Sequence, residues 1–123
     1  GRLWIGGRLG HVITTVDGPV APVRLELAIE SVPSVASAAV VGVGPRGVQQ
    51  VVAVVQTELP PSSPRPAPLD LADAVRAAVD RDVVAVFEVP ALPVDRRHNS
   101  KIDRARVAAW AADVLAGGKV RSL

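Results

Sequence analysis

Lys101 is the residue with the clearest chemical potential, because it stands in a polar turn directly before an expected helix. The segment 92–104 reads LPVDRRHNSKIDR, and the chain has only one other lysine, Lys119. A cation beside a helix N-terminus meets the positive end of the helix dipole, so an arriving phosphate or carboxylate would offset that cost. The alternative is a solvated lysine near Asp95 or Asp103, since exposed ion pairs are common and weak.

Most other kinds of chemistry lack the residues they need. The chain has no cysteine, and His11 and His98 are its only histidines, so we predict no disulfide, no thiolate chemistry and no metal site. There is no glycine-rich phosphate loop and no nucleophilic serine framed by glycines. The formal charge is +2 and the arginines are spread along the chain, so we do not predict nucleic-acid binding.

Length and hydropathy suggest one globular domain. A chain of 123 residues can bury roughly two-thirds of the surface that its unfolded form exposes. The apolar runs 38–43 and 50–55 are far shorter than the roughly 20 residues that span a bilayer, and we expect a cytoplasmic protein with no membrane span. The chain begins at Gly1 without an initiator methionine and looks like a piece of something longer.

The first half predicts a hairpin, a helix and a second hairpin. Residues 2–7 and 11–15 are β-prone and meet around Gly10, and 17–19 suggest a turn. Pro22 opens a helix that closes at Pro33, with Glu26 and Glu30 on its wetter side. The valine-rich runs 37–42 and 48–57 predict two central antiparallel strands joined by a glycine-containing turn.

The second half predicts a loop, two helices and a buried strand. The proline-rich segment 58–68 is expected to be a stiff loop outside any ladder. Asp70 is expected to cap a helix that reaches Arg81, a strand covers 83–89, and apolar spacing predicts a last helix ending at Gly117-Gly118. The fold class is therefore α+β, a small mostly antiparallel sheet with about three helices.

Two segments at opposite ends of the chain together resemble a known domain. They are Gly7-Arg8, Asp17-Gly18-Pro19-Val20-Ala21-Pro22 and Glu26 near the start, and Leu92-Pro93 with Ser100-Lys101-Ile102 near the end. They resemble the C-terminal domain of the adenylate-forming superfamily, which includes acyl-CoA synthetases, luciferases and peptide-synthetase adenylation domains. The resemblance covers essentially residues 1–123 and implies a lid that follows an absent N-terminal ATP-binding domain.

The resemblance implies an activity and roles for three residues. Such enzymes use ATP and magnesium to convert a carboxylic acid into an acyl-adenylate and pyrophosphate, then pass the acyl group to a second nucleophile. Lys101 would bridge the carboxylate and the α-phosphate, and Arg8 would contact the ribose hydroxyls. Gly10 would be the hinge, where glycine accepts almost any backbone conformation. The lid alone would be inactive and would need its own N-terminal domain.

The spacer before Lys101 resembles one branch of the superfamily. Where relatives often have Ser-Gly-Lys, this chain has Arg97-His98-Asn99-Ser100-Lys101, and Thr14 stands where they often have lysine. The longer form resembles the β-lactone synthetases of bacterial olefin biosynthesis, in which the hydroxyl of a long-chain β-hydroxy acid attacks its own activated carbonyl. His98 would carry a proton or, with Arg97 and Asn99, support the loop by hydrogen bonds.

Two other functions stay open from the sequence. An acyl-CoA synthetase or fatty acyl-AMP ligase would share the adenylation step and differ in the acceptor of the acyl group. A non-enzymatic module could instead use basic side chains to dock an acidic partner.

Overall fold

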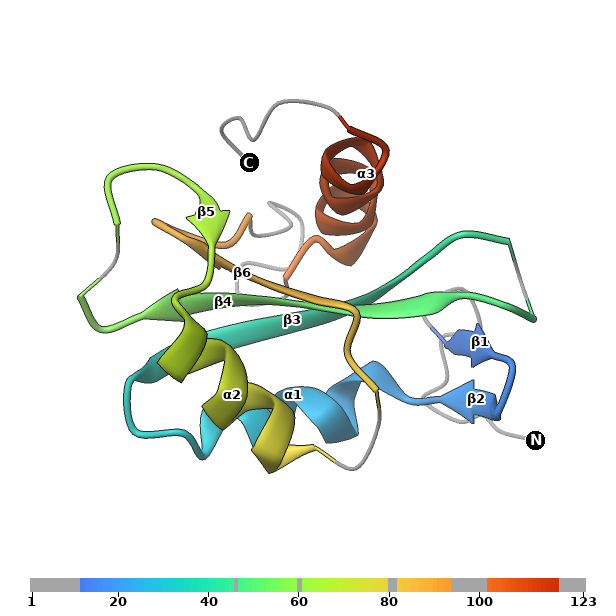
Figure 1. Ribbon diagram of the computed structural model, residues 1–123, viewed down its shortest axis with the longest axis horizontal. Coiled ribbons are helices and arrows are strands. Elements are labelled where there is room, and N and C mark those ends of the chain that lie inside the picture. Colours follow the sequence, from blue (N-terminus) through green and yellow to red (C-terminus); the bar gives the residue numbers. More distant parts are fainter. Residues whose placement is uncertain (1–11, 46, 60, 80–81, 94–101, 118–123) are drawn as a thin grey trace.

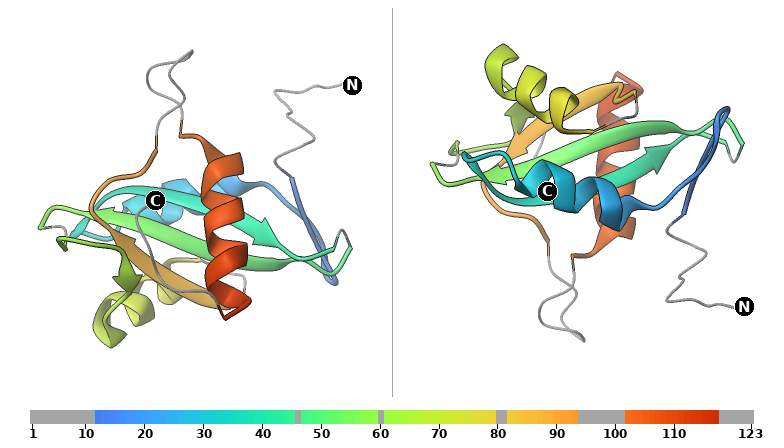
Figure 2. Two further views of the ribbon diagram at one scale, coloured as in Figure 1. Left: turned by 90° about the horizontal axis from the view of Figure 1, so that it is seen from above. Right: turned by 90° about the horizontal axis from the view of Figure 1, so that it is seen from below.

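A four-stranded sheet lies between helices, with α1 and α2 on one face and α3 across the other (Figures 1 and 2). The computed structural model describes residues 12–45, 47–59, 61–79, 82–93 and 102–117. Its elements are β1 (Ile13–Thr15), β2 (Gly18–Val20), α1 (Pro22–Glu30), β3 (Val35–Val43), β4 (Gln50–Thr57), β5 (Arg65–Pro66), α2 (Leu69–Ala78), β6 (Ala85–Val89) and α3 (Arg104–Leu115). None of the helices in these ranges is long and apolar enough to cross a bilayer.

The strand order of the main sheet is β3-β4-β6-β5. The β3/β4 and β5/β6 pairs are antiparallel, while β4 and β6 are parallel, with α2 in the connection between them. Parallel neighbours need such a crossover, whereas β3 and β4 are joined by a short turn. The predicted mostly antiparallel sheet with three helices is confirmed. β3, however, is an edge strand of this sheet, because β6 takes the other side of β4, so our prediction of two central strands was wrong for β3.

The valine-rich central strand is buried on both of its faces. In β4, Val51, Ala53 and Val55 join the core that α1 and α2 cover. The alternating residues Val52 and Val54 join the core beneath α3. Successive strand residues point to opposite faces, so a strand covered on both sides reads as a continuous apolar run.

The core beneath α3 contains an aromatic contact between the helix and the sheet. Phe87 of β6 and Trp110 of α3 pack edge to face, with ring centroids 5.2 Å apart and planes inclined at 82°. Val107 and Ala111 lie on the same buried stripe of α3. The last helix is thereby anchored on the sheet, in agreement with its predicted apolar spacing.

Three predicted boundaries in the second half need correction. Arg65–Pro66 form the short strand β5 within the segment predicted as a loop, and its edge position accommodates a proline. α2 begins at Leu69 after Pro68, so Asp70 is not its N-cap; the Asp70 carboxylate instead accepts a hydrogen bond from the backbone N–H of Leu71. β6 begins at Ala85, which leaves Val84 outside the strand and 45% exposed.

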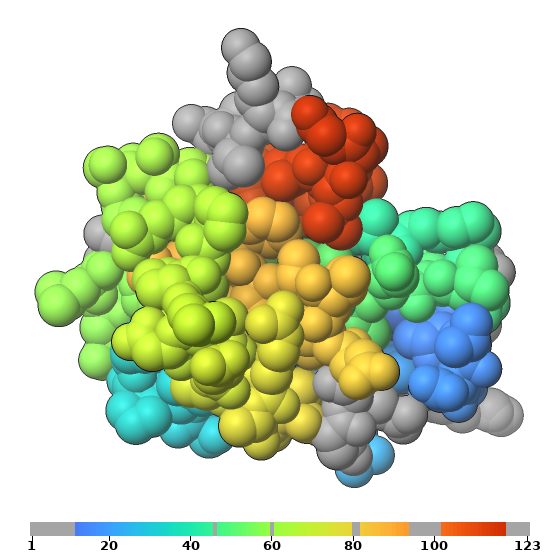
Figure 3. All heavy atoms as spheres, in the orientation of Figure 1, coloured from blue at the N-terminus to red at the C-terminus, as the bar shows by residue number. Residues whose placement is uncertain are grey.

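The first hairpin differs from the predicted one. β1 pairs with β2, so Gly18 and Pro19 lie in a strand and the turn is at Val16 and Asp17. Gly18 has a φ of 117°, a conformation that residues with a Cβ rarely adopt. Residues 2–11, which include the other predicted strand, lie outside the described residues. Figure 3 shows the β1–β2 hairpin against the turn of the β3–β4 hairpin.

Candidate functional site

The six predicted site residues lie outside the described residues. They are Arg8, Gly10, Arg97, His98, Asn99 and Lys101. The structure instead describes the residues that flank them: 92–93 and 102–104 around the Lys101 segment, and the β1–β2 hairpin that follows Gly10. The positions of these flanking residues are what the structure shows about the candidate site.

The described residues on either side of segment 94–101 are joined by a hydrogen bond. The backbone N–H of Asp103 donates to the carbonyl oxygen of Pro93 at 2.9 Å. The backbone N–H of Leu92 donates to Oε1 of Gln56 in β4 at 3.2 Å, and the Leu92 side chain is buried in the core beneath α3. Ile102 packs against the same core. The described residues that flank the Lys101 segment are therefore fixed to each other and to the core beneath α3.

The predicted helix directly after Lys101 is confirmed, since α3 begins at Arg104. Asp103 is its N-cap, and Oδ1 of Asp103 accepts a hydrogen bond of 3.1 Å from the backbone N–H of Arg106. This bond satisfies one of the free donors at the helix N-terminus. Lys101 thus precedes a capped helix start by three residues in the sequence.

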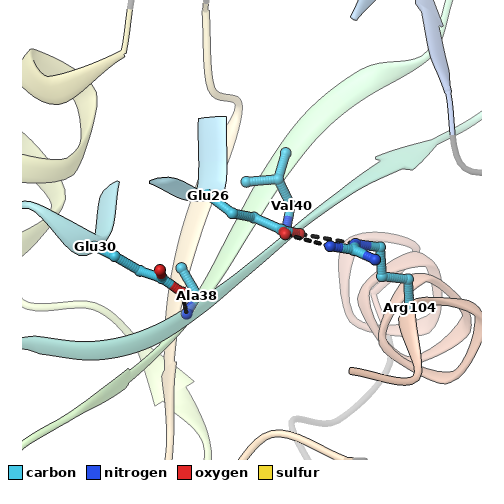
Figure 4. A network of polar contacts seen from close by, with 5 residues as sticks. All are labelled: Glu26, Glu30, Ala38, Val40 and Arg104. Atoms are coloured by element: carbon cyan, nitrogen blue, oxygen red, sulfur yellow. Dashed lines mark hydrogen bonds and ion pairs between the residues drawn. The ribbon is translucent and has the colours of Figure 1, made fainter. Parts of the chain in front are cut away.

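An ion pair connects this helix start to α1. Nε of Arg104 donates to Oε2 of Glu26 at 2.9 Å, and Nη2 of Arg104 donates to Oε1 of Glu26, as Figure 4 shows. The Glu26 side chain is 7% exposed and the Arg104 side chain 21%. The hydrogen bond with Glu26 raises the pKa of Arg104 above its ordinary value, against the opposing effect of burial. Glu26, one of the residues that carry the resemblance, is therefore bound to the first residue of the helix that follows Lys101.

Glu26 also binds the free edge of the sheet. Its Oε2 accepts a hydrogen bond of 2.8 Å from the backbone N–H of Val40 in β3, and Glu30 accepts one of 3.3 Å from Ala38. Figure 4 shows both carboxylates of α1 directed at this strand. The prediction that Glu26 lies on the wetter side of the helix was wrong, because the outward N–H groups of an edge strand need acceptors.

The hairpin that follows Gly10 is fastened to the sheet through Thr14 and Gln49. The backbone N–H of Thr14 donates to Oε1 of Gln49 at 2.9 Å, and the backbone N–H of Gln49 donates to the carbonyl oxygen of Thr14 at 3.0 Å. Oγ1 of Thr14 accepts a hydrogen bond of 2.8 Å from the backbone N–H of Gly47. The position where relatives often carry lysine thus has a structural role in this chain.

Neither metal ligands nor the main hollow of the fold mark a site among the described residues. Within the described ranges, no group of three His, Cys, Asp or Glu residues could hold a metal ion. A hollow of about 630 Å³ lies between the start of α1 and the end of α2, on the side of the sheet away from α3, and Arg24 is the one charged residue among the described residues that line it.

Sequence comparison finds relatives that are much longer than this chain. No protein-family model matches it. The chain is 40% identical over 120 residues to an olefin β-lactone synthetase from Stenotrophomonas maltophilia, and 37% identical over 117 residues to one from Xanthomonas campestris. These alignments cover 94% and 91% of the chain, which spans about one fifth of each relative.

Structure comparison finds the same fold in several solved enzymes. Apo MatB from Rhodopseudomonas palustris matches 88% of the chain with a TM-score of 0.69 and 21% identity. The amide bond synthetase McbA from Marinactinospora thermotolerans matches 85% with a TM-score of 0.63 and 29% identity. In both cases the match covers 21% of the larger protein. These matches and the two sequence relatives confirm the resemblance inferred from the sequence segments.

Proposed function

We propose that this chain, homologous to olefin β-lactone synthetases and with the fold of the C-terminal domain of adenylate-forming enzymes, brings Lys101 to a carboxylic acid and ATP in the intact enzyme. The observation that carries the proposal is the 40% identity over 120 residues to a β-lactone synthetase of which the alignment covers 21%. The remaining four fifths would be the N-terminal domain, which is the partner of this one.

Lys101 would supply the positive charge that the adenylation step needs. The acid carboxylate and the α-phosphate repel each other, and an ammonium between them lowers that repulsion where little water is present. Removing one such preorganised donor typically costs about 3 to 4 kcal/mol. By the resemblance to adenylate-forming enzymes, ATP and Mg²⁺ would be held mainly by the N-terminal domain.

Arg8 and Gly10 would act at the junction between the two domains. Arg8 would contact the ribose hydroxyls of the nucleotide, and rotation at Gly10 would turn the lid. This role is supported by the hairpin that starts three residues after Gly10, because Thr14 and Gln49 tie that hairpin to the sheet. A rotation at Gly10 would then move the hairpin and sheet together.

The second step would be attack by the β-hydroxyl of the substrate on its own activated carbonyl. Both sequence relatives are named for this product, and an intramolecular attack gains from high effective molarity. The spacer Arg97-His98-Asn99 would support the loop that presents Lys101. Transfer to CoA is the main alternative, and a fatty acyl CoA synthetase from Mycobacterium tuberculosis shares the fold at 19% identity.

The first test is adenylation by the full-length enzyme with ATP, Mg²⁺ and a long-chain β-hydroxy acid. We expect Lys101→Ala to reduce pyrophosphate release roughly a hundredfold to a thousandfold without loss of thermal stability. Lys119→Ala, a change at the only other lysine, is the matched control and should release pyrophosphate normally. Near-normal release by Lys101→Ala would contradict the proposed role.

The product mass, with and without CoA, tests the second step. A product that is one water lighter than the acid and forms without CoA would support lactone formation. A thioester that appears only with CoA would contradict it and favour the acyl-CoA synthetase.

A further inference from the structure

We infer that the Glu26–Arg104 ion pair is a positioning pair for adenylation: it holds the start of α3, three residues after Lys101, in register with the sheet so that Lys101 reaches the reacting anions. This inference rests on the proposed function of Lys101. Arg104 and Glu26 are positioning residues here, because they would act through Lys101 and not on the substrate.

Two features besides Arg104 fix the carboxylate of Glu26: its position on α1 and a hydrogen bond from β3. It projects from α1, and its Oε2 accepts the backbone N–H of Val40 at 2.8 Å. Because the side chain is only 7% exposed, water competes little for these bonds. A carboxylate fixed in this way presents both oxygens to the planar fork of a guanidinium, an arrangement stronger and more directional than a single bond.

Arg104 transmits this constraint to the Lys101 segment. It is the first residue of α3, so its side chain fixes the start of the helix relative to α1 and β3. Lys101 stands only three residues before Arg104 in the sequence, so a shift of the helix start would be passed to Lys101 through the chain. The hydrogen bond from the Asp103 N–H to the Pro93 carbonyl also fixes the residue directly before α3. The pair thus fixes the position of the helix start that follows Lys101 in the chain.

A second ion pair in the same fold provides a matched control. Glu88 of β6, 6% exposed, accepts hydrogen bonds from Nε of Arg65 at 2.9 Å and from Thr57 Oγ1 at 2.6 Å, and the Arg65 Nη2 lies 2.8 Å from its Oε1. This pair also joins a guanidinium to a buried carboxylate, but Arg65 belongs to β5, the edge strand opposite β3. If ion pairs served only stability, the two pairs would respond alike to the same substitutions.

The experiment uses the full-length enzyme and four variants: Glu26→Gln, Arg104→Lys, Glu88→Gln and Arg65→Lys. ATP–pyrophosphate exchange measures adenylation, and chemically supplied acyl-adenylate measures the second step alone. We expect the first two variants to lower the kcat of exchange by about ten- to a hundredfold, the range that a small misplacement produces, with an unchanged KM for ATP. Conversion of supplied acyl-adenylate should stay normal, and the Glu88 and Arg65 variants should exchange normally at a comparable melting temperature.

Three results would overturn the inference. Normal exchange by folded Glu26→Gln and Arg104→Lys would show that the pair does not position Lys101. An equal loss in the Glu88 and Arg65 variants, or an equal loss in the conversion of supplied acyl-adenylate, would show a general structural role. If Lys101→Ala exchanges normally, the proposed function itself fails, and this result is distinct because it does not depend on the pair. If Glu26→Gln unfolds below the assay temperature, the comparison uses Arg104→Lys alone, because this variant keeps the positive charge of the pair.

Discussion

The close approach of the β1–β2 hairpin to the sheet depends on Gly42, and Gly42→Ala should loosen it. A Cβ at residue 42 would lie 2.8 Å from Cγ2 of Ile13 and 3.1 Å from Cδ of Gln49. Ile13 is 2% exposed, so it has little space into which to move. Gln49 is held by its bonds to Thr14 and cannot turn away without breaking them. The added methyl must therefore displace the hairpin.

The expected cost is the difference between two opposing effects. Forcing an extra methyl group into a packed core costs about 1–3 kcal/mol. Replacing glycine by alanine also restricts the unfolded chain, which stabilises the fold by about 0.4–1 kcal/mol. We therefore expect Gly42→Ala to lower the free energy of unfolding by about 1–2 kcal/mol, a large fraction of a typical total of about 5–15 kcal/mol.

Urea unfolding of this chain, followed by circular dichroism and by the fluorescence of buried Trp110, measures that change. Ile13→Leu is the matched control, because leucine keeps the volume of isoleucine but lacks the branching methyl that the new Cβ would touch. In a double-mutant cycle, Gly42→Ala should cost clearly less in the Ile13→Leu background. An unchanged midpoint for Gly42→Ala, or the same loss in both backgrounds, would refute the reasoning.

Two further predictions concern the helix that follows Lys101. Asp103→Ala removes the N-cap bond to the Arg106 N–H and should cost about 1 kcal/mol in urea unfolding, whereas Asp103→Asn, which keeps an acceptor, should cost much less. Phe87→Ala removes a ring that is 5% exposed and stacked edge to face on Trp110, and should cost about 3–5 kcal/mol. An effect of Phe87→Ala no larger than that of an exposed control such as Leu59→Ala would contradict the packing described for α3.

Local sequence patterns predicted the elements well where burial follows a simple period. The apolar spacing that includes Val107, Trp110 and Ala111 predicted α3, and all three residues are buried. Pro22 marked the first turn of α1, as its fixed φ favours. These features depend on neighbours in sequence, which is why they can be read without knowing the fold.

The arrangement of the strands could not be read in the same way. A valine-rich run such as that of β4 can pair with a parallel or an antiparallel neighbour. The parallel pairing of β4 with β6 could therefore not be predicted from the sequence of either strand. The proline-rich segment 58–68 masked β5, because only an edge position allows Pro66 in a ladder. The roles of Lys101, Arg8 and Gly10 remain predictions for a related reason: in the proposed function they depend on contacts with an N-terminal domain.

Glu26 shows what a longer-range rule would add to sequence analysis. Glu26 and Glu30 are four residues apart, which is about 6 Å along a helix, and Ala38 and Val40 are two residues apart, which is about 6.6 Å along a strand. The two carboxylates therefore match the two outward N–H groups of β3 that they bind. Such bonds use donors that an open edge would offer to another chain. A pair of acidic residues at this spacing on the helix before a valine-rich strand thus indicates that the strand lies at an edge and that the helix covers it.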